Sequence, residues 1–146
     1  MEKQLVVYLH SDAYDRIYQA VNIIMTAASA GRKCYLFLFY HGLGSFMAGA
    51  WDDMNVSKSA GRRGGEGGEA WERSLERSFE LANLPSLYQL LEQAKNQPGQ
   101  VAVYACSNSV QNLSLDPADV KQRVDEIVGL ATMQQISSGE SQVLYL

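Results

Sequence analysis

The sequence is poor in cysteine, histidine and proline, with two, two and three of these residues among 146. The cysteines, Cys34 and Cys106, stand far apart, without a CxxC pair or a Cys/His cluster. This spacing excludes a zinc ribbon or zinc finger, and we predict no metal site. A reducing compartment also disfavours a structural disulfide, so both thiols are expected to be free.

Long apolar segments and strong positive charge are also missing. No apolar run reaches the roughly 18–20 residues of a transmembrane helix, and the first residues lack the long apolar core and cleavage site of a signal peptide. The net charge is −4, and the basic doublets are Arg32-Lys33 and Arg62-Arg63. These absences predict a cytoplasmic protein that has neither a membrane nor a nucleic acid as partner.

What the sequence does contain is a regular alternation of strand and helix patterns over one domain, residues 1–146. Short apolar runs rich in β-formers predict strands that are buried on both faces, as in a parallel sheet. Strands are predicted at 5–9, 34–39, 101–105, 126–128 and 142–146; helices are predicted at 13–28, 71–82, 85–94 and 130–136, with another beginning at Asp116. The alternation predicts a three-layer α/β/α fold around a mostly parallel sheet.

The stretch from 42 to 70 lacks such a pattern. It contains a glycine-rich segment, and we predict a flexible loop at about 57–68. This loop has no GxxxxGK[ST] pattern, and no phosphate loop follows the first strand, so nucleotide or flavin binding is disfavoured and no cofactor is predicted. Met47, Trp51 and Met54 are expected in an exposed loop, where they either pack back on the domain or form a subunit interface.

Both histidines and one cysteine fall at the predicted carboxyl ends of strands. His10 follows the first strand, His41 the second and Cys106 the third. Ligands of open parallel sheets bind outside these ends, so the three residues are predicted on one edge. The histidines could serve as acid–base groups, help to hold an anion, or simply make hydrogen bonds at strand ends.

Cys106 stands at a predicted strand-to-helix turn, followed by Ser107, Asn108 and Ser109. Free backbone N–H groups and the helix dipole favour a thiolate there, and the three polar side chains add donors. The alternative is that Cys106 is a small buried residue that only fills space, and the residues alone leave both possibilities open. Ser109 lacks a surrounding GxSxG, which disfavours a serine hydrolase.

Two further residues have simpler interpretations. Cys34 begins a buried strand and is expected to be inert packing. Asp12 is most simply a capping residue of the first helix, although it could face the pocket.

Several stretches together resemble the DsrE/DsrF-like sulfur-relay family. Their order and spacing, which span nearly the whole chain outside about 43–70, carry the resemblance. The stretches are Val7–Arg16, Gly31–Phe37, Val103–Ser109, Leu115–Val120 and Val128–Thr132, of which Val103–Ser109 is the most specific.

The resemblance implies a three-layer α/β/α fold with a mainly parallel five-stranded sheet, assembled as a homotrimer or hexamer. It also implies that Cys106 carries sulfane sulfur as a persulfide and passes it to a partner, often a small TusA-like carrier, as a sulfurtransferase does. The alternative is a non-catalytic oligomeric module, with an interface formed by the 47–54 loop and the helix of Trp71.

Overall fold

The computed structural model describes residues 3–52, 74, 77 and 85–146. The predicted flexible loop at about 57–68, Met54 and the helical face containing Trp71 lie outside these residues.

Five strands form one sheet, and every neighbouring pair is parallel. Each forms where apolar and β-branched or aromatic residues run together, as the sequence predicts. The order across the sheet is β4-β3-β2-β1-β5. The strands are β1 (Gln4–Leu9), β2 (Cys34–Leu38), β3 (Val101–Cys106), β4 (Glu126–Val128) and β5 (Ser141–Tyr145).

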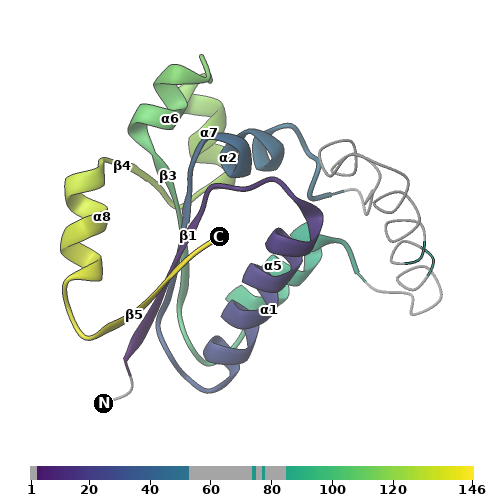
Figure 1. Ribbon diagram of the computed structural model, residues 1–146, viewed down its shortest axis with the longest axis vertical. Helices are drawn as coiled ribbons and strands as arrows, with labels where there is room; N and C mark the ends of the chain where they lie inside the picture. Colours follow the sequence, from purple (N-terminus) through teal and green to yellow (C-terminus); the bar gives the residue numbers. More distant parts are fainter. Residues whose placement is uncertain (1–2, 53–73, 75–76, 78–84) are drawn as a thin grey trace.

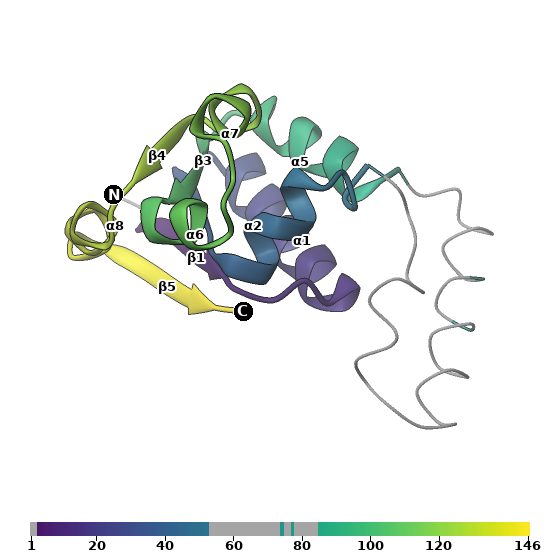
Figure 2. The same cartoon turned by 90° about the horizontal axis from the view of Figure 1, so that it is seen from above.

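Helices lie on both faces of this sheet, which confirms the three-layer α/β/α fold (Figures 1 and 2). One face is covered by α1 and α5, and α8 lies on the other. Among the described residues, no helix has the length and apolar character needed to cross a bilayer. The helices are α1 (Tyr14–Ser29), α2 (Tyr40–Met47), α5 (Leu87–Lys95), α6 (Ser107–Asn112), α7 (Pro117–Arg123) and α8 (Leu130–Ser137).

The core is divided by the sheet because successive side chains of a strand point to opposite faces. In β1, Val7 and Leu9 pack toward α1 and α5, whereas Val6 and Tyr8 pack toward α8. The cluster on the α8 side is smaller and includes Cys106.

Helix α2 was not predicted, because residues 42–70 show no helical pattern. Glycine lowers helix propensity, and α2 contains Gly42 and Gly44. The fold needs Gly42, since a Cβ there would lie 2.7 Å from the carbonyl oxygen of Leu9. The helix begins at Tyr40, whose φ of 35° is in the left-handed region.

The prediction of an exposed loop was wrong for Trp51, which is fully buried. Its ring packs edge-on against Phe46 with centroids 5.0 Å apart, and its Nε1 donates a hydrogen bond to Ser45 Oγ at 2.9 Å. Of the two alternatives for Trp51, packing back on the domain is therefore the one observed. Met47 is half-buried on α2.

Candidate functional site at the carboxyl edge of the sheet

The carboxyl edge of the sheet gathers the residues that the sequence predicted there. His10 directly follows β1, His41 lies in the first turn of α2 just beyond β2, and Cys106 is the last residue of β3. All the strands are parallel, so these ends meet at the same edge (Figure 1).

Cys106 lies at the point where the chain changes sides of the sheet. After β3 the chain passes to the face of α1 and α5, since Val110 of α6 and Val120 of α7 join that core. After β4 it passes to the opposite face, where Met133 of α8 packs. Open α/β sheets bind ligands outside the carboxyl ends of their strands, and the strand order of this sheet reverses between β1 and β5. Cys106 pairs with Val128 of β4, so it lies between the two crossovers that leave β3 and β4 toward opposite faces.

The thiol of Cys106 is packed within the smaller core. The residue is 2 % exposed and belongs to the cluster of Phe37, Val128 and Met133. It is also the N-cap residue of α6, but its side chain makes no capping hydrogen bond. The backbone therefore has the predicted strand-to-helix geometry, while the sulfur contacts apolar groups.

The polar residues after Cys106 differ in their surroundings. Ser107 and Asn108 are exposed in the first turn of α6. Ser109 is fully buried, and its Oγ has no hydrogen-bond partner among the described residues. A buried hydroxyl without a partner is unfavourable, which marks Ser109 as the unusual member of this turn.

The two histidines form a pair. Their ring centroids lie 5.8 Å apart at an interplanar angle of 81°, and the His10 ring is also 5.7 Å from that of Tyr40. The pair is held by the backbone, because Gly42 N donates to the carbonyl oxygen of His10 at 2.9 Å. Both imidazoles are exposed to solvent.

The structure does not bring this pair into contact with the thiol. Leu9, Leu38 and Ala105 are aligned across β1, β2 and β3, so the next row runs His10, Phe39, Cys106. Two strand spacings put the backbones of His10 and Cys106 roughly 10 Å apart. Within the described part of the chain, no hydrogen bond or ring contact joins Cys106 to either histidine.

Asp12 is not the N-cap residue of the first helix. The N-cap residue of α1 is Ala13, which has no side-chain capping bond, and Ser11 Oγ instead accepts a hydrogen bond from Ala13 N at 3.0 Å. The sequence suggested a cap at Asp12 because aspartate is a preferred residue there, but the helix starts one residue later. Asp12 is half-buried in the turn between β1 and α1.

Cys34 has the inert environment that was predicted. It is fully buried at the amino end of β2, and its Sγ lies 3.5 Å from the carbonyl oxygen of Arg32 and 3.8 Å from that of Ile24. Burial raises its pKa to about 11, since the thiolate would lose its hydration. In the described residues, no group of acidic, histidine and cysteine side chains could hold a metal ion.

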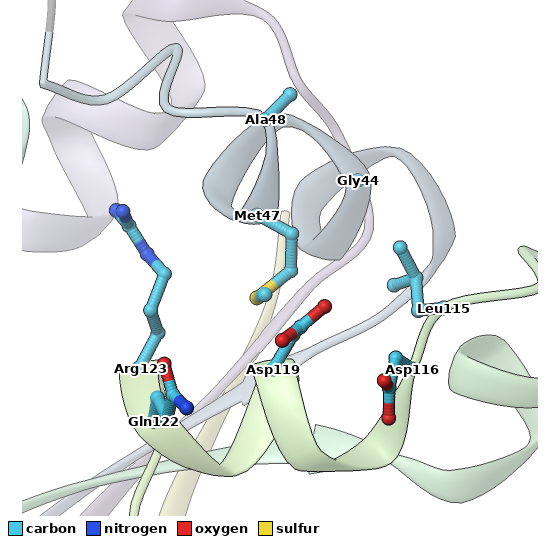
Figure 3. Close-up of a pocket in the computed structure, with 8 residues that line it drawn as sticks. All are labelled: Gly44, Met47, Ala48, Leu115, Asp116, Asp119, Gln122 and Arg123. Carbon is cyan, nitrogen blue, oxygen red and sulfur yellow. The ribbon is translucent and has the colours of Figure 1, made fainter.

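Sequence reasoning missed two cavities near this edge. One, of about 430 Å³, lies between α2 and α7, where Met47 and Asp119 point toward each other (Figure 3). The other, of about 410 Å³, lies beside His10 and the first turn of α8. The second cavity is lined by aromatic and amide residues that come one by one from separate elements. Because these residues are far apart in the sequence, no motif or spacing could have predicted the cavity.

Comparison with known proteins supports the fold alone. No family model and no curated protein matches the chain. A solved protein of unknown function, MTH1491 from Methanobacterium thermoautotrophicum, aligns with a TM-score of 0.59 and 13 % identity over 99 % of this chain and 100 % of its own. A conserved protein of unknown function, BT1422 from Bacteroides thetaiotaomicron, aligns with a TM-score of 0.54 and 8 % identity over 99 % and 95 %.

Proposed function

We propose that this chain is a sulfurtransferase of the DsrE/DsrF-like type, which carries sulfane sulfur as a persulfide on Cys106. The observation that carries the proposal is the position of Cys106 at the carboxyl end of β3, on the edge of the sheet at which folds of this kind bind their ligands. Sulfur as the cargo rests on the sequence resemblance. We further propose a small TusA-like partner, a homotrimer or hexamer, and a cytoplasmic location.

The reaction needs only thiol chemistry. The Cys106 thiolate attacks the outer sulfur of a donor persulfide, the donor S–S bond breaks, and the donor leaves as a thiolate. A thiolate of the partner then attacks the outer sulfur held on Cys106 and restores the Cys106 thiolate. Each step exchanges one S–S bond for another, so no external oxidant or reductant is consumed.

The burial of Cys106 sets a condition on this mechanism. At 2 % exposure the sulfur meets a partner only after side chains of its cluster move. Phe39 is half-buried, packs against that cluster and separates the thiol from His10. Ser107 and Asn108 are exposed in the turn that follows Cys106, and we propose that these polar groups contact the sulfur donor.

Loading with polysulfide tests the proposal. The wild-type protein is expected to gain the mass of added sulfur atoms by intact-mass spectrometry, and Cys106→Ser is expected to gain none. Cys34→Ser is the matched control and should load as the wild type does, since Cys34 lies at the opposite edge. Equal sulfur uptake by Cys106→Ser and the wild type would contradict the proposal.

The same burial favours a second candidate, a non-catalytic oligomeric module in which Cys106 only fills space. Trp51 takes no part in a subunit interface of this module, since it is buried against Phe46. The module predicts slow alkylation of Cys106 in the folded protein. It also predicts that Cys106→Ala leaves partner binding and sedimentation unchanged.

A further inference from the structure

The cavity beside His10 is built from the α8 side of the sheet and from α8 itself. It has a volume of about 410 Å³, within the range of small-molecule sites. Its lining comes from the start of α8, from the ends of β1 and β5 and from residues that directly follow β1, β2 and β5. Its lining residues are Tyr8, His10, Phe39, Leu130, Gln134, Tyr145 and Leu146.

A row of three nearly parallel rings forms the aromatic part of the cavity. Tyr8 lies at the centre, with the centroid of Tyr145 at 4.8 Å and that of Phe39 at 5.6 Å, and with interplanar angles of 22° and 17°. The row ends on Tyr145, which is 75 % exposed. A large aromatic side chain left in water beside a cavity offers a surface that a flat apolar group can cover.

Polar side chains on the cavity are few. No Asp, Glu, Lys or Arg side chain is among the described residues that line it. The hydroxyl of Tyr8 is engaged, at 2.6 Å from Ser137 Oγ and 3.3 Å from the carbonyl oxygen of Met133. The side chains of Gln134 and His10, both exposed, are left as donors and acceptors for a ligand.

We infer that this cavity binds a neutral, planar aromatic or heteroaromatic compound. The ligand packs against Tyr145 and Phe39 by offset-stacked or edge-to-face contacts, and its polar edge bonds to Gln134 and His10. No lysine or arginine is among the described residues that line the cavity, which disfavours phosphorylated ligands such as nucleotides. This site is separate from the sulfur chemistry of Cys106, which does not line the cavity.

Lumichrome, a neutral fluorescent tricyclic heteroaromatic, is a suitable probe. Titration of the full chain, followed by fluorescence anisotropy, is expected to show saturable one-to-one binding. Tyr145→Ala should weaken binding about tenfold, as the loss of a stacking surface does elsewhere, and Tyr145→Phe should bind as the wild type does. Gln134→Leu should weaken binding about fivefold, the effect of one hydrogen bond.

Two control variants show whether lumichrome binding depends on this cavity. Leu113→Ala removes another exposed apolar side chain, 38 % exposed and outside the cavity, and should leave lumichrome binding unchanged. Cys106→Ser should also bind lumichrome normally, so a failure of sulfur loading and a failure of this inference remain distinguishable. Flavin mononucleotide, the phosphorylated relative of the probe, should bind more weakly than lumichrome.

Three results would overturn the inference. The first is lumichrome binding that does not saturate. The second is binding that Tyr145→Ala and Gln134→Leu leave unchanged. The third is a lower sedimentation coefficient of Tyr145→Ala without probe, which would mean that a second copy of the chain covers this surface.

Discussion

The two edges of the sheet hold one cysteine each, and a glycine near each cysteine has a different amount of space around it. At the amino edge, a Cβ on Gly99 would lie 2.8 Å from the Cα of Ala28, because the backbone at Gly99 packs directly against the backbone of α1. At the carboxyl edge, a Cβ on Gly129 would meet no atom nearer than Ser107 Oγ at 3.8 Å.

Exposure alone does not distinguish the thiols, since Cys34 is 0 % and Cys106 2 % exposed. They are distinguished by their positions in the strands, because Cys34 begins β2 and Cys106 ends β3. Cys34 is enclosed where the chain passes tightly from α1 to β2, and Cys106 lies where two crossovers diverge. Our proposal for Cys106 therefore rests on the edge of the sheet at which it stands and not on its exposure.

The largest expected effect contrasts the two glycines. Gly99→Ala should lower the free energy of unfolding by about 3 kcal/mol, because its methyl group overlaps the backbone of α1. Gly129→Ala should change it by no more than about 0.5 kcal/mol, since the space is open and the φ of −83° suits alanine. Urea denaturation followed by far-UV circular dichroism measures both, and similar losses would remove the contrast between the edges.

Alkylation compares the thiols directly. At pH 8 the Cys34 thiolate should be about 100-fold scarcer than that of an ordinary thiol, because burial raises its pKa from 9.0 to about 11. Folded Cys106→Ser protein should therefore resist iodoacetamide, whereas folded Cys34→Ser protein should be labelled at Cys106. In denaturant both variants should react alike. Comparable labelling rates in the folded state would mean that the edges do not differ in reactivity.

The raised pKa of Cys34 also predicts a pH dependence of stability. Between about pH 9 and 11 the unfolded state loses the thiol proton while the folded state keeps it, so stability present below pH 9 is lost as the pH rises. The loss in unfolding free energy should be about 2 kcal/mol across this window. Cys34→Ala should remove this part of the decline in stability, whereas the control variant Cys106→Ala should keep it. If the decline is the same in Cys34→Ala as in the wild type, it arises from other titratable groups.

The smallest expected effect concerns the carboxyl edge. Ser109→Ala should raise the free energy of unfolding by about 1 kcal/mol, because it removes a buried hydroxyl without a partner. Ser107→Ala, at an exposed position in the same turn, should change it by less than about 0.5 kcal/mol. Thermal unfolding of the pair measures the difference. Destabilisation by Ser109→Ala would show that its hydroxyl is satisfied in solution.

The sequence was sufficient for the features that depend on local pattern. Continuous apolar runs such as Leu5–Leu9 predicted buried parallel strands, and the carboxyl-end positions of His10, His41 and Cys106 followed from the strand boundaries. Helix α2 escaped prediction because its Gly42 serves close packing against β1 and not helix propensity. A pattern within one segment does not report such long-range packing.

The candidate site was predictable in position but not in detail. Cys106 is buried in a cluster to which α8, after a further strand, contributes Met133. The separation of the thiol from His10 depends on Phe39, which directly follows the strand between them. Both facts arise from side chains brought together by the sheet, and neither has a signature within Val103–Ser109.

The pairing of β1 with β5 has a consequence for how the chain folds. Gln4 Nε2 donates a hydrogen bond to Ser141 Oγ at 2.6 Å, across 137 positions. Closing so long a loop is entropically costly, and parallel pairings between distant segments form slowly. During synthesis β1 emerges early, and one of its edges keeps unpaired backbone groups until β5 arrives. Through that interval a nascent chain exposes an edge on which another strand can pair, and protection by a chaperone would matter most then.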